Sequence, residues 1–415
     1  MTNPQQGVSE VTTFFRKGLI GMVLACTTAL PALAKDISWI YCGDAIDPVH
    51  EKAIQDWDAK NPDFKIAVEV VGWEQCQDKA TTLAAAGSPA GLAYVGSRTL
   101  KEFAQNDMIV PVPMTDAEKA SYYPGIVNTV TSGGTQWGVP IAFSTKALYW
   151  NKDLFKQAGL DPEKPPTTWA EEIEDAKVIK EKTGIPGYGL SAKTFDNTMH
   201  QFLHWVYTNN GQVVDADGNI KLDSPEVLAA LKAYKDITPY AEEGPTAYEQ
   251  NEVRAIFLDG KVAMIQAAVG AAFRLKETKI NWGVTDLPLG PDAKGKGTLL
   301  ITDSLAVFKG SGVEDKAVEF AKFITSPAVQ EAYEGGGAAG LTPLRPSPAV
   351  DKMVADSPYW KPFIDGIASG GPEPLFTDYK GFQNVMIEMV QSVVTGAAEP
   401  EAAMKKAAAA LEEYK

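Results

Sequence analysis

The feature that most constrains the fold is a repeated change of hydrophobic period near the start of the chain. Three short apolar runs, at 36–41, 64–73 and 91–97, have the length and composition of strands. Between them, residues 48–62 and 74–89 carry apolar side chains at helical spacing, with Pro or Gly at their ends. Alternating strands and helices favour a parallel sheet with right-handed crossovers. We therefore predict an α/β fold.

In such a sheet, ligands meet the loops that follow the carboxyl ends of the strands. The predicted loops lie at 42–47, 72–74 and 96–98. An acidic, an aromatic, a hydroxyl and a cationic side chain lie there, together with one glycine, and the ligand-binding candidates are Gly43, Asp44, Trp73, Ser97 and Arg98. The alternatives are that Asp44 caps a helix, that Trp73 belongs to the core and that Arg98 forms a surface ion pair.

The first 34 residues have the pattern of a secretory signal peptide. Arg16 and Lys17 precede an apolar stretch at 18–30, and Ala32-Leu33-Ala34 is a small-x-small cleavage site. We expect export to the periplasm with cleavage after Ala34. A lipoprotein form is the alternative, because "VLAC" at 23–26 partly resembles a lipobox.

Length and charge narrow the class of protein further. The chain has 415 residues, enough for two domains, and a net charge of −15 without basic runs. Such a chain is not expected to bind nucleic acid or anionic lipid. Cys42 and Cys76 remain after cleavage, and in an oxidising compartment they either form a disulfide or stay as two buried thiols.

Helical and strand patterns continue to the end of the chain with no turn-rich linker. If the chain forms two domains, it must therefore pass between them as extended strand. Three apolar segments fit such crossings, at 140–145, 298–308 and 339–346.

The order of six segments resembles the extracellular solute-binding proteins of bacterial carbohydrate ABC importers, the maltose-binding-protein-like group. Each segment is weak alone, but six of them in the family's order form a strong pattern, and the resemblance covers most of the mature chain. They read "TLAAAGSPAGLAYVGSRTLKEFAQNDMIVPV", "QWGVPIAFSTKALYWNKDLFKQAGLD", "PPTTWAEEI", "IFLDGKVAMIQAAVGAAF", "WGVTDLPLGPD" and "AVEFAKFITSPAVQEAY". Where family members often carry Pro-Asp-Val, this chain has "SPAGLAYV" at 88–95, so no member's substrate can be carried over.

The resemblance implies two α/β lobes, each a mainly parallel sheet flanked by helices, joined by a multi-strand hinge. Residues 35–143 and about 304–345 would form the first lobe, and 144–303 and about 346–415 the second. It also implies a monomer that captures a sugar, polyol or glycoside between the lobes and delivers it to membrane permease subunits. Whether that ligand carries an anionic group stays open.

Further ligand-binding candidates follow from the crossings and from the second lobe. A pocket for sugars needs aromatic faces and polar hydrogen-bonding groups. Tyr149 and Trp150 fit better in the core of the second lobe. The candidates at the crossings are Phe143, Ser144, Asp303 and Arg345, and those in second-lobe loops are Phe195, beside Asp196, Tyr248, Val269 and Gly270.

A secreted glycoside hydrolase is the alternative, because it needs only two carboxylates across a cleft. His200 and His204 have the spacing of a zinc helix, but Gln201 stands where a metallohydrolase needs its glutamate. No motif for a cofactor accompanies them. We therefore expect a binding protein without catalytic residues, cofactor or metal.

Overall fold

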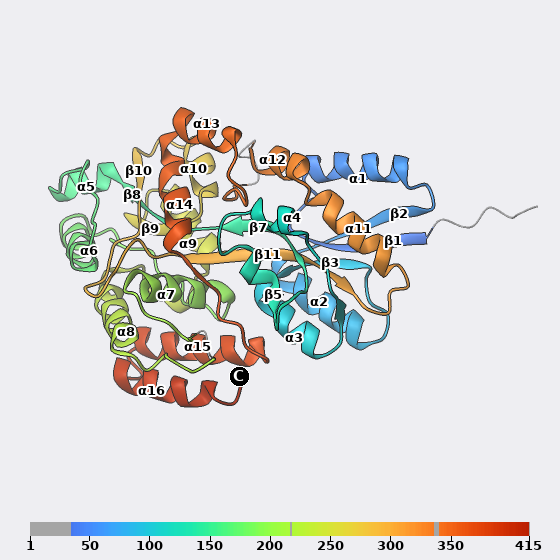
Figure 1. The fold of residues 1–415 in the computed structure, drawn as a ribbon. Helices are drawn as coiled ribbons and strands as arrows, with labels where there is room; N and C mark the ends of the chain where they lie inside the picture. Colours follow the sequence, from blue (N-terminus) through green and yellow to red (C-terminus); the bar gives the residue numbers. More distant parts are fainter. Residues whose placement is uncertain (1–34, 216–217, 336–339, 415) are drawn as a thin grey trace, which may run out of the picture. The chain divides into compact units, whose positions relative to one another are not determined.

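The computed structural model describes residues 35–215, 218–335 and 340–414 (Figure 1). The predicted signal peptide and its cleavage site lie outside these residues. Within the described ranges, no helix combines the length and the apolar character needed to cross a bilayer.

The first lobe is built on a seven-stranded sheet. Strand β1 pairs in parallel with β2 and β3, as the strand–helix pattern predicts. Strand β11 runs antiparallel to β3, β4 and β7, and parallel to β12. The strands are β1 (Lys35–Cys42), β2 (Phe64–Val71), β3 (Leu92–Gly96), β4 (Ile109–Val110), β7 (Val139–Ser144), β11 (Leu299–Phe308) and β12 (Gly371–Pro372).

Helices and one short hairpin complete this lobe. Trp39, Phe103, Phe308 and Phe320 belong to its hydrophobic core, which lies between the sheet and the helices. The further elements are α1 (Pro48–Lys60), α2 (Trp73–Ala85), η1 (Ser97–Thr99), α3 (Leu100–Gln105), α4 (Asp116–Ala120), η2 (Val127–Val130), β5 (Thr131–Ser132), β6 (Thr135–Gln136), α11 (Glu314–Ile324) and α12 (Pro327–Gly335).

The second lobe contains a three-stranded sheet in the order β10-β8-β9, with β8 at Ala147–Asn151, β9 at Met264–Ala267 and β10 at Trp282–Thr285. Both pairings are antiparallel. This corrects our expectation of a mainly parallel sheet in each lobe. The parallel rule applies when one helix connects two neighbouring strands. Here several helices lie between β8 and β9, so that rule sets no direction for this pair.

Many helices surround this smaller sheet. Tyr149 and Trp150 are buried in the second lobe's cores, as predicted. The helices are α5 (Lys152–Ala158), α6 (Trp169–Thr183), α7 (Asp196–Thr208), α8 (Pro225–Ile237), η3 (Thr238–Tyr240), η4 (Pro245–Ala247), α9 (Gln250–Leu258), α10 (Gly270–Leu275), α13 (Pro348–Asp356), η5 (Pro358–Trp360), α14 (Lys361–Asp365), η6 (Gly366–Ser369), α15 (Tyr379–Val394) and α16 (Pro400–Leu411).

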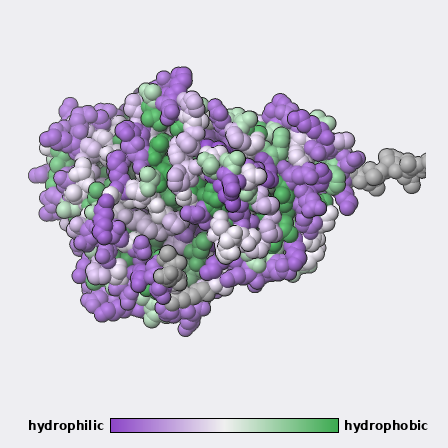
Figure 2. All heavy atoms as spheres, in the orientation of Figure 1, coloured by the Kyte–Doolittle hydropathy of each residue, from purple (hydrophilic) through white to green (hydrophobic). Residues whose placement is uncertain are grey.

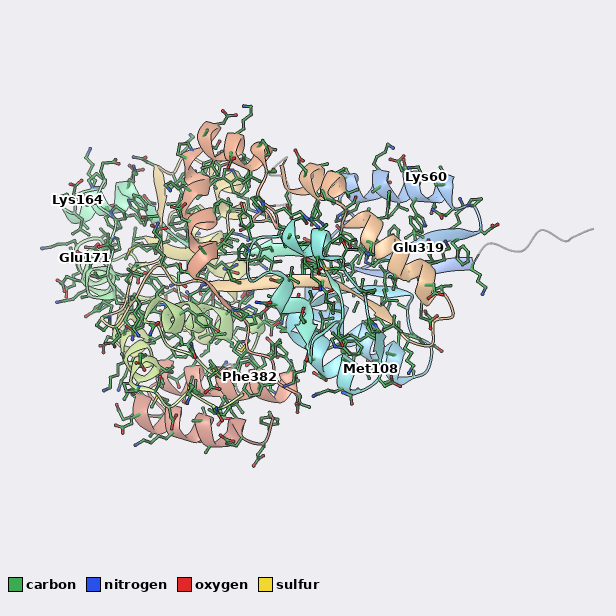
Figure 3. All side chains as sticks on the ribbon, viewed as in Figure 1. Lys60, Met108, Lys164, Glu171, Glu319 and Phe382 are labelled. Carbon is green, nitrogen blue, oxygen red and sulfur yellow. A yellow bond between two sulfur atoms is a disulfide. The ribbon has the colours of Figure 1, made fainter. Side chains whose placement is uncertain are left out.

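The helix ends follow local sequence signals. Thr168 and Glu171 form a capping box at the start of α6, and Gly184 ends that helix with φ of 72°. Charged side chains cover the outer helix faces, and hydrophilic residues predominate on the face seen in Figure 2. Figure 3 labels the exposed Lys60 and Lys164 and the buried Phe382 of α15.

The chain passes between the two sheets at several adjacent places. Strand β7 ends at Ser144 and β8 begins at Ala147, so only two residues separate the sheets there. The backbone N–H of Thr342 donates to the carbonyl of Phe143 over 2.9 Å, which sets a second segment beside this passage. Strand β11 is a member of the first sheet from Leu299 onward.

A disulfide joins Cys42 to Cys76, so the bridge, not the pair of thiols, is present. Cys42 is the last residue of β1, and Cys76 lies in the first turn of α2. The bridge therefore fixes the start of α2, where Trp73 lies, to the end of the neighbouring strand.

Candidate functional site

Arg98 lies at the centre of an ion cluster between the lobes. Its Nη2 is 2.7 Å from an oxygen of Asp196, and its Nη1 is 3.4 Å from Glu373 and 3.7 Å from Asp303. Arg98 follows β3 in the turn η1, whereas Asp196 is the first residue of α7 in the second lobe. We call Arg98, Asp196, Asp303 and Glu373 the ion cluster.

The local backbone structure brings the charged groups of the ion cluster close together. Asp303 lies on β11, where the pairing with β7 shifts register between Asp303 and Ser304. Such an irregularity redirects side chains and is common beside functional sites. Helix α7 lies beside β11, so its first residue reaches the same region (Figure 1).

The electrostatics of the cluster follow from one guanidinium facing three carboxylates. Burial opposes the charge on Arg98, yet Glu373 and Asp196 hold its pKa well above its usual value. Burial raises the pKa of Asp303 to about 6, although Arg98 acts against that rise. For Asp196, burial acts to raise the pKa, but the charges of Arg98 and His200 and the hydrogen bond from Arg98 together lower it. Of Asp196 and Asp303, Asp303 is therefore the one that takes up a proton at the higher pH.

Aromatic rings flank the ion cluster. Trp73 is 52% exposed, unusually open for a large apolar side chain, and its ring meets Tyr94 edge to face at 5.2 Å. The hydroxyl of Tyr94 donates to Asp303 over 3.1 Å. The guanidinium of Arg98 lies 5.4 Å from the ring centre of Tyr379. An exposed ring beside carboxylates suits a ligand with C–H faces and hydroxyls.

A small polar cavity adjoins the cluster on the second-lobe side. His200 connects the two, because its Nε2 lies 2.6 Å from Glu373. The cavity measures about 10 Å³ and contains no carboxylate among its described lining residues. We call it the polar cavity, and its lining residues are Lys146, Ser191, Asn197, His200, Gln201, His204, Gln250 and Gln266.

Two side chains of this cavity, Lys146 and His204, have lowered pKa values. Burial and the nearby charge of Arg254 lower the pKa of Lys146 to about 7. Its Nζ donates to Gln250 over 3.1 Å. Burial also holds the pKa of His204 well below its usual value. The Nδ1 of His204 accepts the backbone N–H of Leu299 over 3.1 Å, so the ring proton lies on Nε2.

Four buried polar atoms in this region have no hydrogen-bond partner within the described parts of the chain. They are Arg98 Nε, Asp196 Oδ1, His204 Nε2 and Gln266 Oε1. An unpartnered buried polar group costs about 1–3 kcal/mol. Several such atoms around one interlobe position mark it as a place where a ligand or ordered water supplies the partners.

A larger cavity of about 670 Å³ adjoins the ion cluster at Glu373 and is lined in part by Lys101 of α3, Tyr207 near the end of α7 and residues 369–375. Its size would admit a larger ligand. It lacks the exposed aromatic ring and the group of unpartnered polar atoms, so the ion cluster and polar cavity form the stronger candidate site.

Three of the residues selected from the sequence, Trp73, Arg98 and Asp303, lie together in this region. Asp44 is exposed, and the cap of α1 is instead Asp47, which removes the alternative role considered for Asp44. Gly43 precedes Asp44, and its N–H donates to the carbonyl of Val71.

Other candidate residues predicted from the sequence are packed in the protein interior. Ser97 is buried and its hydroxyl lies 2.5 Å from that of Ser304. The side chains of Phe143 and Val269 are buried in the first- and second-lobe cores. Gly270 lies against the backbone of Gly340, where a Cβ on Gly270 would come within 3.3 Å of the Gly340 carbonyl oxygen. That close approach explains the glycine without a ligand.

The remaining selected residues lie at the margins. Ser144 is half-buried at the end of β7, and Phe195 is the N-cap residue of α7, next to Asp196. The carbonyl of Tyr248 accepts the N–H of Lys193, so its loop lies near the same helix start. Arg345 lies apart from the ion cluster: it donates to Ser121 and stacks on the ring of Tyr122 at 3.8 Å.

Several residues of the site were not selected from the sequence. Lys146 is close to the selected Ser144, and the pair of histidines on α7 was considered only as a metal motif. Among the described residues, no group of three or more His, Cys, Asp or Glu is arranged to hold a metal ion. The unselected residues are Tyr94, Lys146, His200, His204, Gln266, Glu373 and Tyr379.

Solved structures with the same fold cover nearly the whole chain. Maltose-bound MalE3 of T. maritima is 25% identical, covers 91% of this chain and 99% of its own, and has a TM-score of 0.78. A solute-binding protein of Thermotoga lettingae bound with α-D-tagatose is 24% identical, covers 92% and 99%, and has a TM-score of 0.80. A ribitol-bound solute-binding protein of Agrobacterium radiobacter K84 is 21% identical, covers 92% and 98%, and has a TM-score of 0.73.

Relatives found by sequence are also binding proteins. A binding protein of Brucella abortus (strain 2308) is 28% identical over 87% of this chain and 88% of its own length. The sn-glycerol-3-phosphate-binding periplasmic protein of the same organism is 32% identical over 51% of each chain. The family model for bacterial extracellular solute-binding proteins matches residues 44–331. This chain, a two-lobed α/β protein, therefore belongs to the bacterial extracellular solute-binding protein family.

Proposed function

We propose that this protein is the substrate-binding component of a carbohydrate ABC importer and holds a sugar or polyol between its lobes. The observation that carries the proposal is the exposed ring of Trp73 beside an interlobe cluster with unpartnered polar atoms. Neighbours of the same fold were solved with maltose, tagatose and ribitol. A ring and convergent hydrogen-bonding groups are what such ligands require.

Ligand binding would change the position of one lobe relative to the other. A ligand that contacts both Trp73 in the first lobe and Asp196 in the second favours the state in which these residues lie close together. The lobes meet near residue 144 and near residue 299, and again at residues 340–345. A monomer in this ligand-bound state would dock on membrane permease subunits after export and cleavage beyond Ala34.

The protein binds its ligand without changing it. A hydrolase would need one carboxylate as acid and a second as base or nucleophile. Here Asp196, Asp303 and Glu373 share the single guanidinium of Arg98, an arrangement suited to recognition. The family is a class of binding proteins, which supports the same conclusion.

A thermal-shift panel tests this function. The mature protein would be heated with maltose, D-tagatose, ribitol or sn-glycerol 3-phosphate. A ligand at a hundred times its dissociation constant adds about 2.7 kcal/mol to the free energy of unfolding, and Tm rises visibly. If no sugar or polyol in the panel raises Tm, the proposal fails. Disappearance of the bound ligand over hours, followed by NMR, would instead indicate an enzyme.

A further inference from the structure

The polar cavity has a donor and acceptor pattern that specifies its occupant. His204 Nε2 is an N–H donor without a partner, and Gln266 Oε1 is an acceptor without one, among the residues that the structure describes. Lys146 Nζ donates to Gln250 and has further N–H bonds to give. The cavity thus offers two donors and one acceptor at one place.

A hydroxyl group matches this pattern. Its oxygen has two lone pairs, one for Lys146 and one for His204, and its proton can be donated to Gln266. The volume of about 10 Å³ is close to that occupied by one water-sized oxygen. A carboxylate or a phosphate brings two or more oxygens and, when ionised, no proton for Gln266 Oε1.

We propose that the polar cavity is a specificity subsite that takes one uncharged hydroxyl of the bound carbohydrate, with Lys146, His204 and Gln266 as its partners. This inference rests on the proposed function and narrows it. The part of the ligand that enters the second lobe is a free alcohol, and any anionic group of the ligand lies outside this cavity.

The geometry also explains why the cavity adjoins the ion cluster. His200 lines the cavity and at the same time binds Glu373, which in turn binds Arg98. A ligand that places one hydroxyl in the cavity therefore brings its neighbouring hydroxyls towards Asp196 and Arg98. These groups carry the other unpartnered atoms of the site.

The test uses whichever of maltose, D-tagatose or ribitol binds most tightly, together with each of its monodeoxy derivatives. Isothermal titration calorimetry would measure every affinity on the mature protein. We expect one monodeoxy compound to bind at least about 100-fold more weakly, because it leaves buried donors and an acceptor unpaired. The other derivatives should lose much less. A uniformly small loss would mean that the cavity holds only an ordered water, and would overturn the inference.

Variants identify the residues that read this hydroxyl. In Lys146→Met and in Gln266→Leu, the penalty for the critical monodeoxy compound should fall to less than about 10-fold, because the partner is already absent. Lys146→Met should fold, since it removes a buried amine that lacks a carboxylate partner. Lys152→Met, which removes an ion pair with Glu163, is the control and should keep the wild-type profile.

The binding measurements distinguish a failure of this inference from a failure of the proposed function. If both variants lose affinity but keep the full monodeoxy penalty, another part of the site reads that hydroxyl and the inference is wrong, while carbohydrate binding stands. If none of the three probes binds, the proposed function itself fails.

Discussion

The two lobes hold their sides of the site in different ways. In the first lobe, Trp73 and Arg98 follow parallel strands, and a disulfide and a sheet fix their positions. In the second lobe, Asp196, His200 and His204 project from one helix, and Gln266 comes from an antiparallel strand. The first side is charged and aromatic, whereas the second is polar and mostly uncharged. In one binding cleft, the positions of the side chains on one side can thus be determined by sheet topology, and those on the other side by helix packing.

The largest effect should come from Arg98, which joins the two sides. In Arg98→Met, the buried Glu373 and the partly buried Asp196 and Asp303 lose their shared cation, so the free energy of unfolding should fall by about 3–5 kcal/mol. Urea denaturation of the mature protein measures this change. The double variant Arg98→Met with Asp196→Asn should recover part of the loss.

Arg254→Met supplies the control for that experiment. Arg254 is also partly buried in the second lobe, but its guanidinium donates to the side-chain oxygen of the exposed Asn251. Its replacement should change the unfolding free energy by less than about 1 kcal/mol. Equal losses in both arginine variants would show that the ion cluster does not join the lobes energetically.

The disulfide sharpens the contrast between the lobes, because it supports the first side alone. Cys42 and Cys76 are separated by 34 residues, and closing a loop of that length stabilises the folded state by about 3–4 kcal/mol. The Cys42→Ser, Cys76→Ser double variant should lose that amount in urea denaturation. It should also bind ligand more weakly, since Trp73 begins the helix that the bridge holds.

A dithiothreitol titration of the wild type is the matching measurement. Reduction should lower Tm of the wild type and leave Tm of the double variant unchanged. A wild type that is insensitive to the reductant, with the bridge shown to be open, would mean that strand pairing alone holds the first side of the site.

The second lobe should show a pH dependence that arises from Glu172 of α6. Burial and the nearby charge of Asp175 raise the pKa of Glu172 to about 8. Neither carboxylate oxygen has a partner among the described residues. The folded state therefore keeps a proton that the unfolded chain releases near pH 4.5. This contribution to stability is complete below pH 4.5 and is lost as the pH rises through 8.

Glu172→Gln should raise the free energy of unfolding at pH 8 by an amount on the order of 2 kcal/mol. At pH 4 the same substitution should have little effect, because both states then carry the proton. Urea denaturation at the two pH values measures the difference. An equal effect at both would show that Glu172 is not titrating in the folded protein.

The difference between the lobes also explains how much could be predicted from sequence. The alternation of strand and helix before residue 97 predicts parallel strands, and the ends of those strands lead directly to Trp73 and Arg98. Asp303 was selected because it is an acidic residue within a predicted crossing segment. Chain topology therefore predicted much of the first side.

No comparable sequence rule predicts the residues that the second lobe contributes to the site. His200 and His204 lie on a helix buried along most of its length, where a core histidine and a binding histidine have the same sequence pattern. Glu373 reaches Arg98 across 275 residues of sequence, which no local pattern encodes. The antiparallel sheet places Gln266 by a register that depends on several intervening helices. These contacts are set by tertiary packing.

The smallest effect should come from Trp73, the ring that the first lobe exposes. Trp73→Ala should weaken ligand binding by about 10-fold, because stacking on a sugar face contributes about 0.5–1.5 kcal/mol beyond burial. Its unfolding free energy should change little, since half of the side chain is already in solvent. Calorimetric titration with the ligand from the panel measures the affinity.

Two further variants decide whether the ring itself matters. Trp73→Phe should keep most of the affinity, because a smaller ring still offers an apolar face. Val70→Ala removes another exposed apolar side chain of the same lobe, 40% exposed on β2, and should leave the affinity unchanged. If Trp73→Ala binds as tightly as Val70→Ala, the first lobe contributes to binding through its charged groups alone. The two sides of the site would then differ only in that the first binds through charges and the second through hydrogen bonds.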